Sequence, residues 1–471
     1  MADSRRSEPQ AQLSVFDAVV IMVGLVVGIG IFRTPSIVAS GVDSEWMFIL
    51  VWVLGGLVTL IGALCYAELC AAHPHAGGEY HFLSRAYGRP LAMLFGWARC
   101  TVIQTGSIAL VAFLLGDYLA QVVPLGPHGP ALYAALAVLV LTAVNIAGTA
   151  AGKNLQIVVT LIQVAAMLAI IVFGFLGTAE PGVAAAPPLP PSEQAAALGV
   201  AMIFVLLTYG GWNDTAYLGG ELKDAPRNMA KVLTMGTALL VTLYVLANMA
   251  LLSVLGLDGL RASDAVAADM MRLAAGPSGE ILVTLAIVVA AISTLNASIF
   301  TGARVFYALG RDVPALRWLG VWNGRGRTPA NGQIVQAVLA LALIGMGAIT
   351  RDGFKAMVDY TAPVFWLFLF MVSLSLFVLR WRLPGRELPF KVPLYPLTPA
   401  AFCLASLYML YASVVHTGAS ALVGLAVLLA GVPVLWLWRQ PRQAAAQPPT
   451  HALAAPDAAV FHPPHTPGDP P

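Results

Sequence analysis

Two short stretches of the sequence decide how the chain folds. They read Gly24-Leu-Val-Val-Gly28-Ile29-Gly30-Ile31-Phe32 and Leu207-Thr208-Tyr209-Gly210-Gly211-Trp212-Asn213-Asp214. Each lies near the middle of a long apolar run, and its closely spaced glycines predict a break in a helix. A break at membrane depth leaves backbone N–H and C=O groups without helical partners, which is tolerated only where they are buried in protein or face a polar cavity. We therefore expect both stretches to line polar surroundings inside a bilayer.

The composition places the rest of the chain in the membrane as well. Of 471 residues, 59% are hydrophobic and only 10% are charged, against about 25% charged residues in ordinary soluble domains. The mean hydropathy is +0.81 over the whole chain. Because each helical span needs about 20 apolar residues, the sequence predicts an all-α polytopic membrane protein with twelve transmembrane helices. The predicted spans are residues 13–39, 46–70, 91–118, 130–148, 154–178, 196–221, 231–256, 279–309, 331–350, 355–379, 397–416 and 419–438.

The distribution of positive charge predicts the orientation of these spans. Most of the 25 Lys and Arg residues lie on the same side as the two termini, and positively charged loops stay in the cytoplasm. The opposite side carries only Arg261, Arg272, Arg351 and Lys355. We therefore expect a multi-pass protein of the cytoplasmic (plasma) membrane with both termini cytoplasmic.

The chain divides into one membrane domain and two tails. Residues 1–12 form a predicted cytoplasmic N-terminal tail, and residues 13–440 form the transmembrane domain. Residues 441–471 are rich in Ala, Pro and His without a periodic apolar pattern, which predicts a disordered cytoplasmic tail. The stretch 181–191 between two spans is too rich in proline for a helix, so we expect an exposed connector there.

Several classes of function receive no support from the sequence. The net charge is only +2, without a basic stripe, so nucleic acid is not an expected partner. His73 and His75 lack further clustered ligands, and we expect no metal and no cofactor. None of the familiar catalytic motifs is present, so we do not expect an enzyme.

The positions of the two breaks suggest a binding site for a zwitterion. The second break lies five spans after the first, as expected for two inverted repeats, and paired interruptions of this kind mark the binding site of a transporter. N–H groups around Ile29, Gly30 and Ile31 would bind a carboxylate at the positive end of a half-helix. The carbonyls of Val26, Val27 and Leu207 would bind an ammonium group. An alternative is that Gly24 and Gly28 only permit close packing of helices.

The side chain of such a ligand is expected among residues of the second break, namely Tyr209, Trp212 and Asn213. The complete set of predicted substrate-binding residues is Val26, Val27, Gly28, Ile29, Gly30, Ile31, Leu207, Tyr209, Gly210, Trp212, Asn213 and Asp214. An ionisable residue inside the membrane is a functional candidate by default. Asp214 is therefore expected to bind a cationic side chain or a proton, or to cap the second half-helix.

Three other acidic residues are expected near the cytoplasmic ends of helices. Glu68, Glu79 and Glu221 would form ion pairs with positively charged residues that close the inner side. The expected partners are Arg85, Arg227 and Arg304.

An ordered series of motifs resembles the amino acid, polyamine and organocation (APC) superfamily, and within it the L-type amino acid transporter branch. The motifs are Gly28-Ile-Gly30-Ile31-Phe32, Tyr66-Ala-Glu68-Leu69, Gly77-Gly78-Glu79-Tyr80, Tyr209-Gly-Gly-Trp212-Asn213 with Glu221, Pro226-Arg-Asn228, Asn296-Ala-Ser298-Ile-Phe300-Thr301-Gly-Ala-Arg304, Arg311-Asp312 and Pro389-Phe-Lys-Val-Pro393-Leu-Tyr395-Pro396. The resemblance covers residues 13–440. It implies a five-plus-five inverted repeat with broken helices 1 and 6 plus two extra helices, which moves amino acids by alternating access, and a carboxylate site at Gly28, Ile29 and Gly30.

The sequence departs from this family at three positions. Leu207 stands where the family has an aromatic gate, and Ile29 stands where Ser or Ala is common. Gln163 aligns with a lysine of span 5 whose charge replaces a sodium ion in several members. Because Gln163 cannot titrate, coupling to protons through this position is not expected, which leaves obligatory exchange, uniport or a proton carried elsewhere. In addition, residues 121–130 between spans 3 and 4 contain no cysteine, so no disulfide-linked heavy chain is expected.

The sequence thus favours a secondary transporter or exchanger for neutral L-amino acids, with a small-molecule amino acid substrate in a lipid bilayer. One alternative is a permease for polyamines or cationic amino acids that uses Asp214 as the counter-ion. A more distant alternative is a membrane sensor or enzyme.

Overall fold

In a computed structural model of the chain, residues 11–28, 30–177, 191–263, 265–324, 326–349, 353–383, 385 and 387–437 are described. These residues are almost entirely helical, and the β pairings among them are two isolated bridges. The elements are α1 (Val15–Val26), α2 (Gly30–Ser40), α3 (Glu45–Ala72), α4 (Gly78–Tyr87), α5 (Arg89–Ala98), the π-helical η1 (Arg99–Ile103), α6 (Gln104–Val122), α7 (Gly129–Ala147), α8 (Thr149–Leu176), α9 (Pro191–Thr208), the 3₁₀-helical η2 (Trp212–Gly220), α10 (Ala225–Ala262), α11 (Val266–Asp312), the 3₁₀-helical η3 (Pro314–Leu316), α12 (Ala330–Ile349), α13 (Gly353–Arg382) and α14 (Leu397–Leu437).

The helices match the predicted membrane architecture. Nine spans in the described residues are long and apolar enough to cross a membrane, and the bent α1–α2 pair makes a tenth. The other two predicted spans are present in shorter pieces, which are α9 with η2 and the part of α14 from Leu422 to Leu435. The prediction of an all-α polytopic membrane protein is confirmed.

Three predicted loop regions contain helix. Residues between the predicted seventh and eighth spans belong to α10 and α11, which bend at Gly256 and Gly276. Both glycines have positive φ angles (64° and 72°), so each helix changes direction there without losing its flanking turns. Pro191, assigned to the connector 181–191, begins α9, since proline is accepted in the first turn of a helix. The α4 helix between the second and third spans was not predicted. The rest of the connector and residues 438–471 lie outside the described residues.

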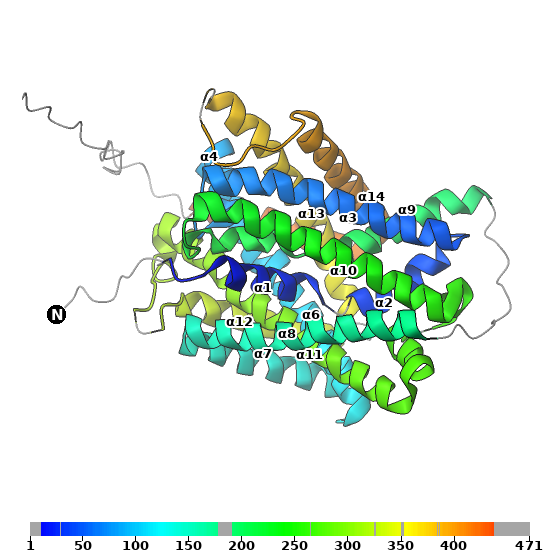
Figure 1. Ribbon diagram of the computed structural model, residues 1–471. Helices are drawn as coiled ribbons and strands as arrows, with labels where there is room; N and C mark the ends of the chain where they lie inside the picture. Colours follow the sequence, from blue (N-terminus) through cyan, green and yellow to red (C-terminus); the bar gives the residue numbers. More distant parts are fainter. Residues whose placement is uncertain are drawn as a thin grey trace, which may run out of the picture.

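Both predicted helix breaks are present. The axes of α1 and α2 differ by 47°, and the Gly28 N–H turns back to the Val26 carbonyl at 2.7 Å. Between α9 and η2, Gly211 has a φ of 103°, which favours glycine, and an added Cβ would lie 3.1 Å from the Leu25 carbonyl. The two breaks therefore contact each other inside the bundle. Figure 1 shows α1 and α2 running through the bundle, with α3 and α10 packed side by side next to them.

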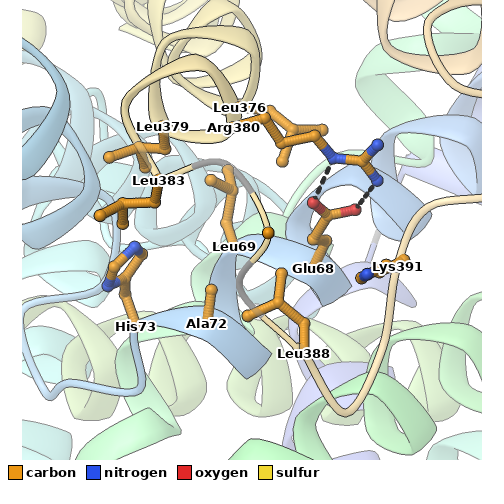
Figure 2. A pocket seen from close by; sticks show the side chains of 11 residues that line it. Glu68, Leu69, Ala72, His73, Leu376, Leu379, Arg380, Leu383, Leu388 and Lys391 are labelled. Atoms are coloured by element: carbon orange, nitrogen blue, oxygen red, sulfur yellow. Dashed lines mark hydrogen bonds and ion pairs between the residues drawn. The ribbon is translucent and has the colours of Figure 1, made fainter.

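Ion pairs join the helices near the end of the bundle that holds Leu13. Glu221, directly after η2, accepts a hydrogen bond from Arg304 Nε at 2.6 Å. This pair was among those predicted. Glu68 instead binds Arg380, with two bonds of 2.6 and 2.5 Å (Figure 2). It accepts a third bond from the Val392 N–H. The predicted partners of Glu68 were wrong, because α13 packs beside α3 here and presents its last-turn arginine.

Candidate functional site

A cavity of about 280 Å³ lies where the two helix breaks meet. We call it the central cavity. It extends from the breaks along α6, α9, α11 and α13. Its lining residues are Leu25, Val26, Gly28, Gly30, Thr34, Arg99, Ile103, Gln104, Ser107, Leu110, Val111, Leu114, Phe204, Leu206, Leu207, Thr208, Gly210, Gly211, Asn213, Asp214, Thr294, Ser298, Val358, Thr361, Ala362 and Phe365.

The first turn of α2 supplies one wall of the cavity. The helix begins at Gly30, and the N–H groups of its first turn have no carbonyl partner within the helix. Space beside the two glycines is limited: a Cβ on Gly30 would lie 3.2 Å from Thr208 Oγ1, and one on Gly28 would lie 3.1 Å from Thr294 Oγ1. The Thr34 and Thr208 hydroxyls are hydrogen-bonded at 2.7 Å, which joins α2 to α9 at this point. The result is a glycine-lined surface with the positive end of a helix directed at the cavity. Ile29 lies outside the described residues.

The carbonyls at the end of α1 are less available than predicted. The Val26 carbonyl accepts bonds from the Tyr244 hydroxyl and from the Gly28 N–H, both at 2.7 Å. Since a carbonyl has two lone pairs, the expectation that this one is free was wrong. The Leu207 carbonyl accepts one bond, from the Gly210 N–H at 3.0 Å, and keeps capacity for another donor.

The aromatic residues of the second break point away from the cavity. Tyr209 is fully buried and donates to the Trp52 carbonyl at 3.2 Å. Trp212 packs edge-on against Tyr66, with 4.9 Å between ring centroids. Gly211 turns the chain between these two residues. Both rings contact residues of a neighbouring helix, α3, and not the cavity. Of the residues expected to surround the ligand side chain, Asn213 lines the central cavity and the two aromatic residues do not.

The remaining predicted residues divide in the same way. The lining residues Val26, Gly28, Gly30, Leu207, Gly210, Asn213 and Asp214 were all predicted. Val27 and Ile31 are buried in the hydrophobic core and do not line the cavity. Helix periodicity explains this outcome, because neighbouring residues on a half-helix face different directions.

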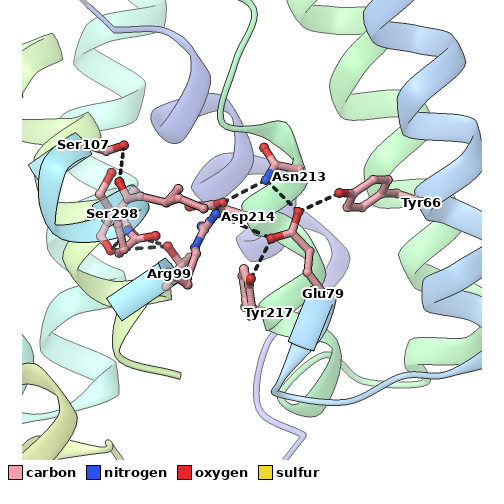
Figure 3. Close-up of polar contacts among 12 residues, drawn as sticks. Tyr66, Glu79, Arg99, Ser107, Asn213, Asp214, Tyr217 and Ser298 are labelled. Atoms are coloured by element: carbon pink, nitrogen blue, oxygen red, sulfur yellow. Dashed lines mark hydrogen bonds and ion pairs between the residues drawn. The ribbon is translucent and has the colours of Figure 1, made fainter. Parts of the chain in front are cut away.

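A group of buried polar side chains closes one end of the cavity, and Figure 3 shows how they converge. We call it the floor cluster; it consists of Tyr66, Glu79, Arg99, Asn213, Asp214 and Tyr217. Arg99 comes from η1 and forms a very short ion pair with Asp214 Oδ1. Its other terminal nitrogen lies 3.5 Å from Glu79 Oε2. The cluster therefore connects η1, η2, α3 and α4 at the base of the cavity.

Glu79 is the most completely hydrogen-bonded member of the floor cluster. The Tyr66 and Tyr217 hydroxyls donate to its two oxygens at 2.6 and 2.7 Å. Asn213 Nδ2 donates to Oε1 at 3.0 Å and also to Asp214 Oδ1 at 3.2 Å. Glu79 was predicted to pair with an arginine at the inner side, and its charged partner is Arg99, outside the expected set.

Arg99 was not among the predicted site residues. It lies within a predicted span, and a guanidinium at membrane depth is a functional candidate for the same reason as Asp214. Its helix widens into a π-helix from Arg99 to Ile103, a feature that is frequent at functional sites. The expectation that Asp214 caps the second half-helix was wrong. The N-cap of η2 is Gly211, and no side chain caps this end of the helix.

Gln163 lies on α8, away from the lining of the central cavity. Its side chain is 1% exposed, and within the described part of the chain neither of its amide atoms has a hydrogen-bond partner. One and two turns earlier on α8, Thr160 and Gln156 bind each other and Ser293 of α11. This polar layer packs against α1, where a Cβ on Gly24 would lie 1.9 Å from Gln156 Nε2. Gly24 is thus required for close packing of α1 against α8. This agrees, for Gly24, with the alternative that the glycines of the first break permit close packing of helices.

Comparisons with known proteins agree with this architecture. The family model described as "Amino acid permease" matches residues 13–436. The chain is 29% identical to the b(0,+)-type amino acid transporter 1 of Mus musculus, covering 86% of this chain and 83% of that protein. It is 29% identical to the large neutral amino acids transporter small subunit 2 of Mus musculus, over 90% and 80% of the two chains. It is 27% identical to the serine/threonine exchanger SteT of Bacillus subtilis, over 90% and 96%.

The family model runs through both helix breaks and nearly all the described helices. The matches confirm the resemblance to the APC superfamily and to transporters of the L-type branch. The chain belongs to the amino acid permease family.

Proposed function

We propose that this amino acid transporter is a secondary active transporter or exchanger that carries neutral L-amino acids across the cytoplasmic membrane by alternating access. Membership of the permease family establishes amino acid transport by a multi-pass membrane protein. The relatives that act on large neutral amino acids and on serine and threonine support the neutral class. The observation that carries the proposal is that the N-terminus of α2 lies in the wall of the central cavity. The rest of the cavity lining is partly polar and partly apolar.

We infer a position in this cavity for each part of an amino acid. The carboxylate would bind the N–H groups at Ile29, Gly30 and Ile31, since the N-terminus of a helix favours anions. The ammonium group would bind the Leu207 carbonyl, which accepts only the bond from the Gly210 N–H among those described. The side chain would extend toward Ser298, Gln104 and Phe365 and end near the floor cluster.

The alternative of a polyamine or a cationic amino acid uses Asp214 as the counter-ion. In the structure, Asp214 already has Arg99 as its ionic partner. A cationic cargo would have to approach this guanidinium, which also lines the cavity. The pairing therefore favours neutral cargo.

The proposal includes three further points. Both termini are cytoplasmic, with residues 1–12 and 441–471 as tails on that side. No disulfide-linked heavy chain is needed, which the burial of the thiols of Cys65, Cys70, Cys100 and Cys403 supports. The protein has no catalytic role, because transport follows from binding and a change of access alone.

Transport by purified protein in liposomes tests the proposal. Vesicles loaded with an unlabelled neutral L-amino acid should take up the labelled form, and lysine or putrescine should compete poorly. The variant Gly30→Val should lose at least 90% of this counterflow while it keeps its thermal unfolding transition, because its side chain fills the space beside Thr208. Gly345→Val on α12 is the matched control, since a Cβ there meets nothing within 4 Å.

Normal counterflow by Gly30→Val would show that the carboxylate is bound elsewhere. Strong competition by putrescine, lost in Asp214→Asn, would favour the cationic alternative. Binding of amino acids without any counterflow would favour a sensor.

A further inference from the structure

The floor cluster contains an uneven number of charges. Glu79 and Asp214 are two carboxylates, whereas Arg99 is the one guanidinium, so the cluster has a net charge of −1 when all three are ionised. The exposed fractions of these side chains are 4%, 11% and 2%, respectively. A buried charge without a partner is strongly unfavourable, and a carboxylate in this situation is neutralised by a proton. The cluster is therefore a place where one proton can bind.

The hydrogen bonds show which carboxylate would take up the proton. Both oxygens of Glu79 are occupied by donors, from two tyrosines, Asn213 and Arg99. A carboxylate that accepts several hydrogen bonds is stabilised in its charged form. The bonds described for Asp214 all reach Oδ1, and Asp214 lines the central cavity whereas Glu79 does not. This leaves Asp214 Oδ2 as the oxygen for the proton, on a residue that lines the cavity.

The other groups around Asp214 leave it as the titrating member. The charged or titratable neighbours are Arg99 from η1, Glu79 from α4 and Tyr217 from η2. The α6 and α11 walls contribute Gln104 and Ser298, which do not titrate near neutral pH. Position 163 on α8 is a glutamine, so α8 offers no substitute charge there.

We propose that Asp214 binds a proton and carries it across the membrane together with the amino acid. This inference rests on the proposed function and adds the coupling ion to it. The proton enters through the cavity and binds Oδ2, which converts the carboxylate to a neutral acid and removes the ion pair with Arg99. Arg99 then keeps Glu79 as its single ionic partner, and the cluster becomes neutral.

Loss of the Arg99–Asp214 pair also provides a link to the change of access. The pair joins η1 to η2 at the base of the cavity, between the ligand site and the end of the bundle where Glu221 binds Arg304. Without it, η2 is held to the rest of the floor by the hydrogen bonds that Asn213 and Tyr217 donate to the Glu79 carboxylate. Opening of the floor then releases the amino acid and the proton on the same side.

Two histidines nearby do not confuse a test near neutral pH. His75 lies between α3 and α4, and His81 lies in α4, outside the predicted spans. Burial lowers the pKa of both, and it lowers the pKa of His81 to about 3. Both imidazoles are therefore harder to protonate than a free histidine, which limits their contribution to a test between pH 6.5 and 7.5.

Proton movement in liposomes tests this inference. Vesicles containing a pH-sensitive dye, with the membrane potential clamped, receive a neutral L-amino acid that gives counterflow at equal pH. With an outside pH about one unit below the inside pH, coupling of one proton per amino acid should give about tenfold accumulation, and the interior should acidify. Asp214→Asn should lose both effects, and the loss should exceed any change in its counterflow rate measured at equal pH, whereas Asp214→Glu should keep both.

Asp269→Asn is the matched control, because Asp269 forms an ion pair with Arg272 at 3.0 Å near the start of α11, away from the cavity. This variant should accumulate its substrate like the unmodified protein. Counterflow without proton movement in the unmodified protein would overturn the inference and leave the proposed function intact. Proton-driven accumulation that persists in Asp214→Asn would also overturn it. Absence of counterflow in the unmodified protein would instead contradict the proposed function itself.

Discussion

Two buried ionic sites hold the two ends of η2, and they differ in charge balance. At its C-terminal end, Glu221 and Arg304 form a pair of one carboxylate and one guanidinium, with side chains 0% and 1% exposed. At its N-terminal end, the floor cluster has two carboxylates for one guanidinium. Arg304 is also enclosed by the rings of Phe300 and Trp322, whereas Arg99 and Asp214 line a cavity.

The difference separates a permanent lock from a switch. In a buried pair of one carboxylate and one guanidinium, each charge is compensated, so neither group gains stability by binding or releasing a proton. Breaking the pair leaves a charge without a partner. An unbalanced cluster that is open to a cavity can change its charge by one proton. We therefore expect changes at Glu221–Arg304 to affect stability, and changes at Asp214 to affect coupling.

The largest loss of stability is expected for Arg304→Ala. This variant leaves the Glu221 carboxylate buried without its ionic partner, which typically costs about 3–5 kcal/mol. Unfolding by titration with a denaturing detergent in mixed micelles measures the effect. The double variant Glu221→Gln with Arg304→Met should recover most of the loss, because no unpaired charge remains. A loss below about 1 kcal/mol in Arg304→Ala would contradict the assignment of this pair as a lock.

A smaller loss is expected for Glu79→Gln. The amide places a donor group where the carboxylate accepted bonds from Tyr66 and Tyr217, and a buried polar group left without a partner costs about 1–3 kcal/mol. Asp214→Asn is the informative comparison, because it leaves Arg99 and Glu79 as a balanced pair. We expect it to lower the unfolding free energy by less than Glu79→Gln does, in the same unfolding assay. The reverse order would mean that Glu79 is the carboxylate that takes up the proton.

The smallest effect is expected for Arg89→Ala, at an ion pair near the surface. Arg89 lies 3.0 Å from Asp312, and its side chain is 65% exposed. Exposed pairs contribute about 0.2–1 kcal/mol because solvent and salt screen them, so the unfolding free energy should change by no more than that. Measurement at low and high salt should show the remaining effect shrink. A salt-independent loss of several kcal/mol would mean that solvent exposure does not make the Arg89–Asp312 pair weaker than the buried Glu221–Arg304 pair.

The sequence allowed prediction of the membrane architecture and of both helix breaks. Glycines inside apolar runs, such as those at Gly28 and Gly211, have a local effect on the backbone that short-range rules capture. The partner of Asp214 could not be predicted, since Arg99 lies 115 residues earlier and the sequence does not show which helices are neighbours. For the same reason the partner of Glu68 was missed, at a separation of 312 residues. The outward direction of Tyr209 and Trp212 depends on the left-handed turn at Gly211, which a helical pattern does not show.

One measurement tests most directly the central claim that the two helix breaks bind an amino acid by its carboxylate. The thermal unfolding of the protein in detergent is followed with each of the twenty amino acids and with their decarboxylated amines, since a ligand that binds the folded state raises its apparent stability. Several neutral L-amino acids should raise the unfolding temperature, and their amines should not. An equal or larger shift with the amines would show that the N-terminus of α2 does not bind a carboxylate.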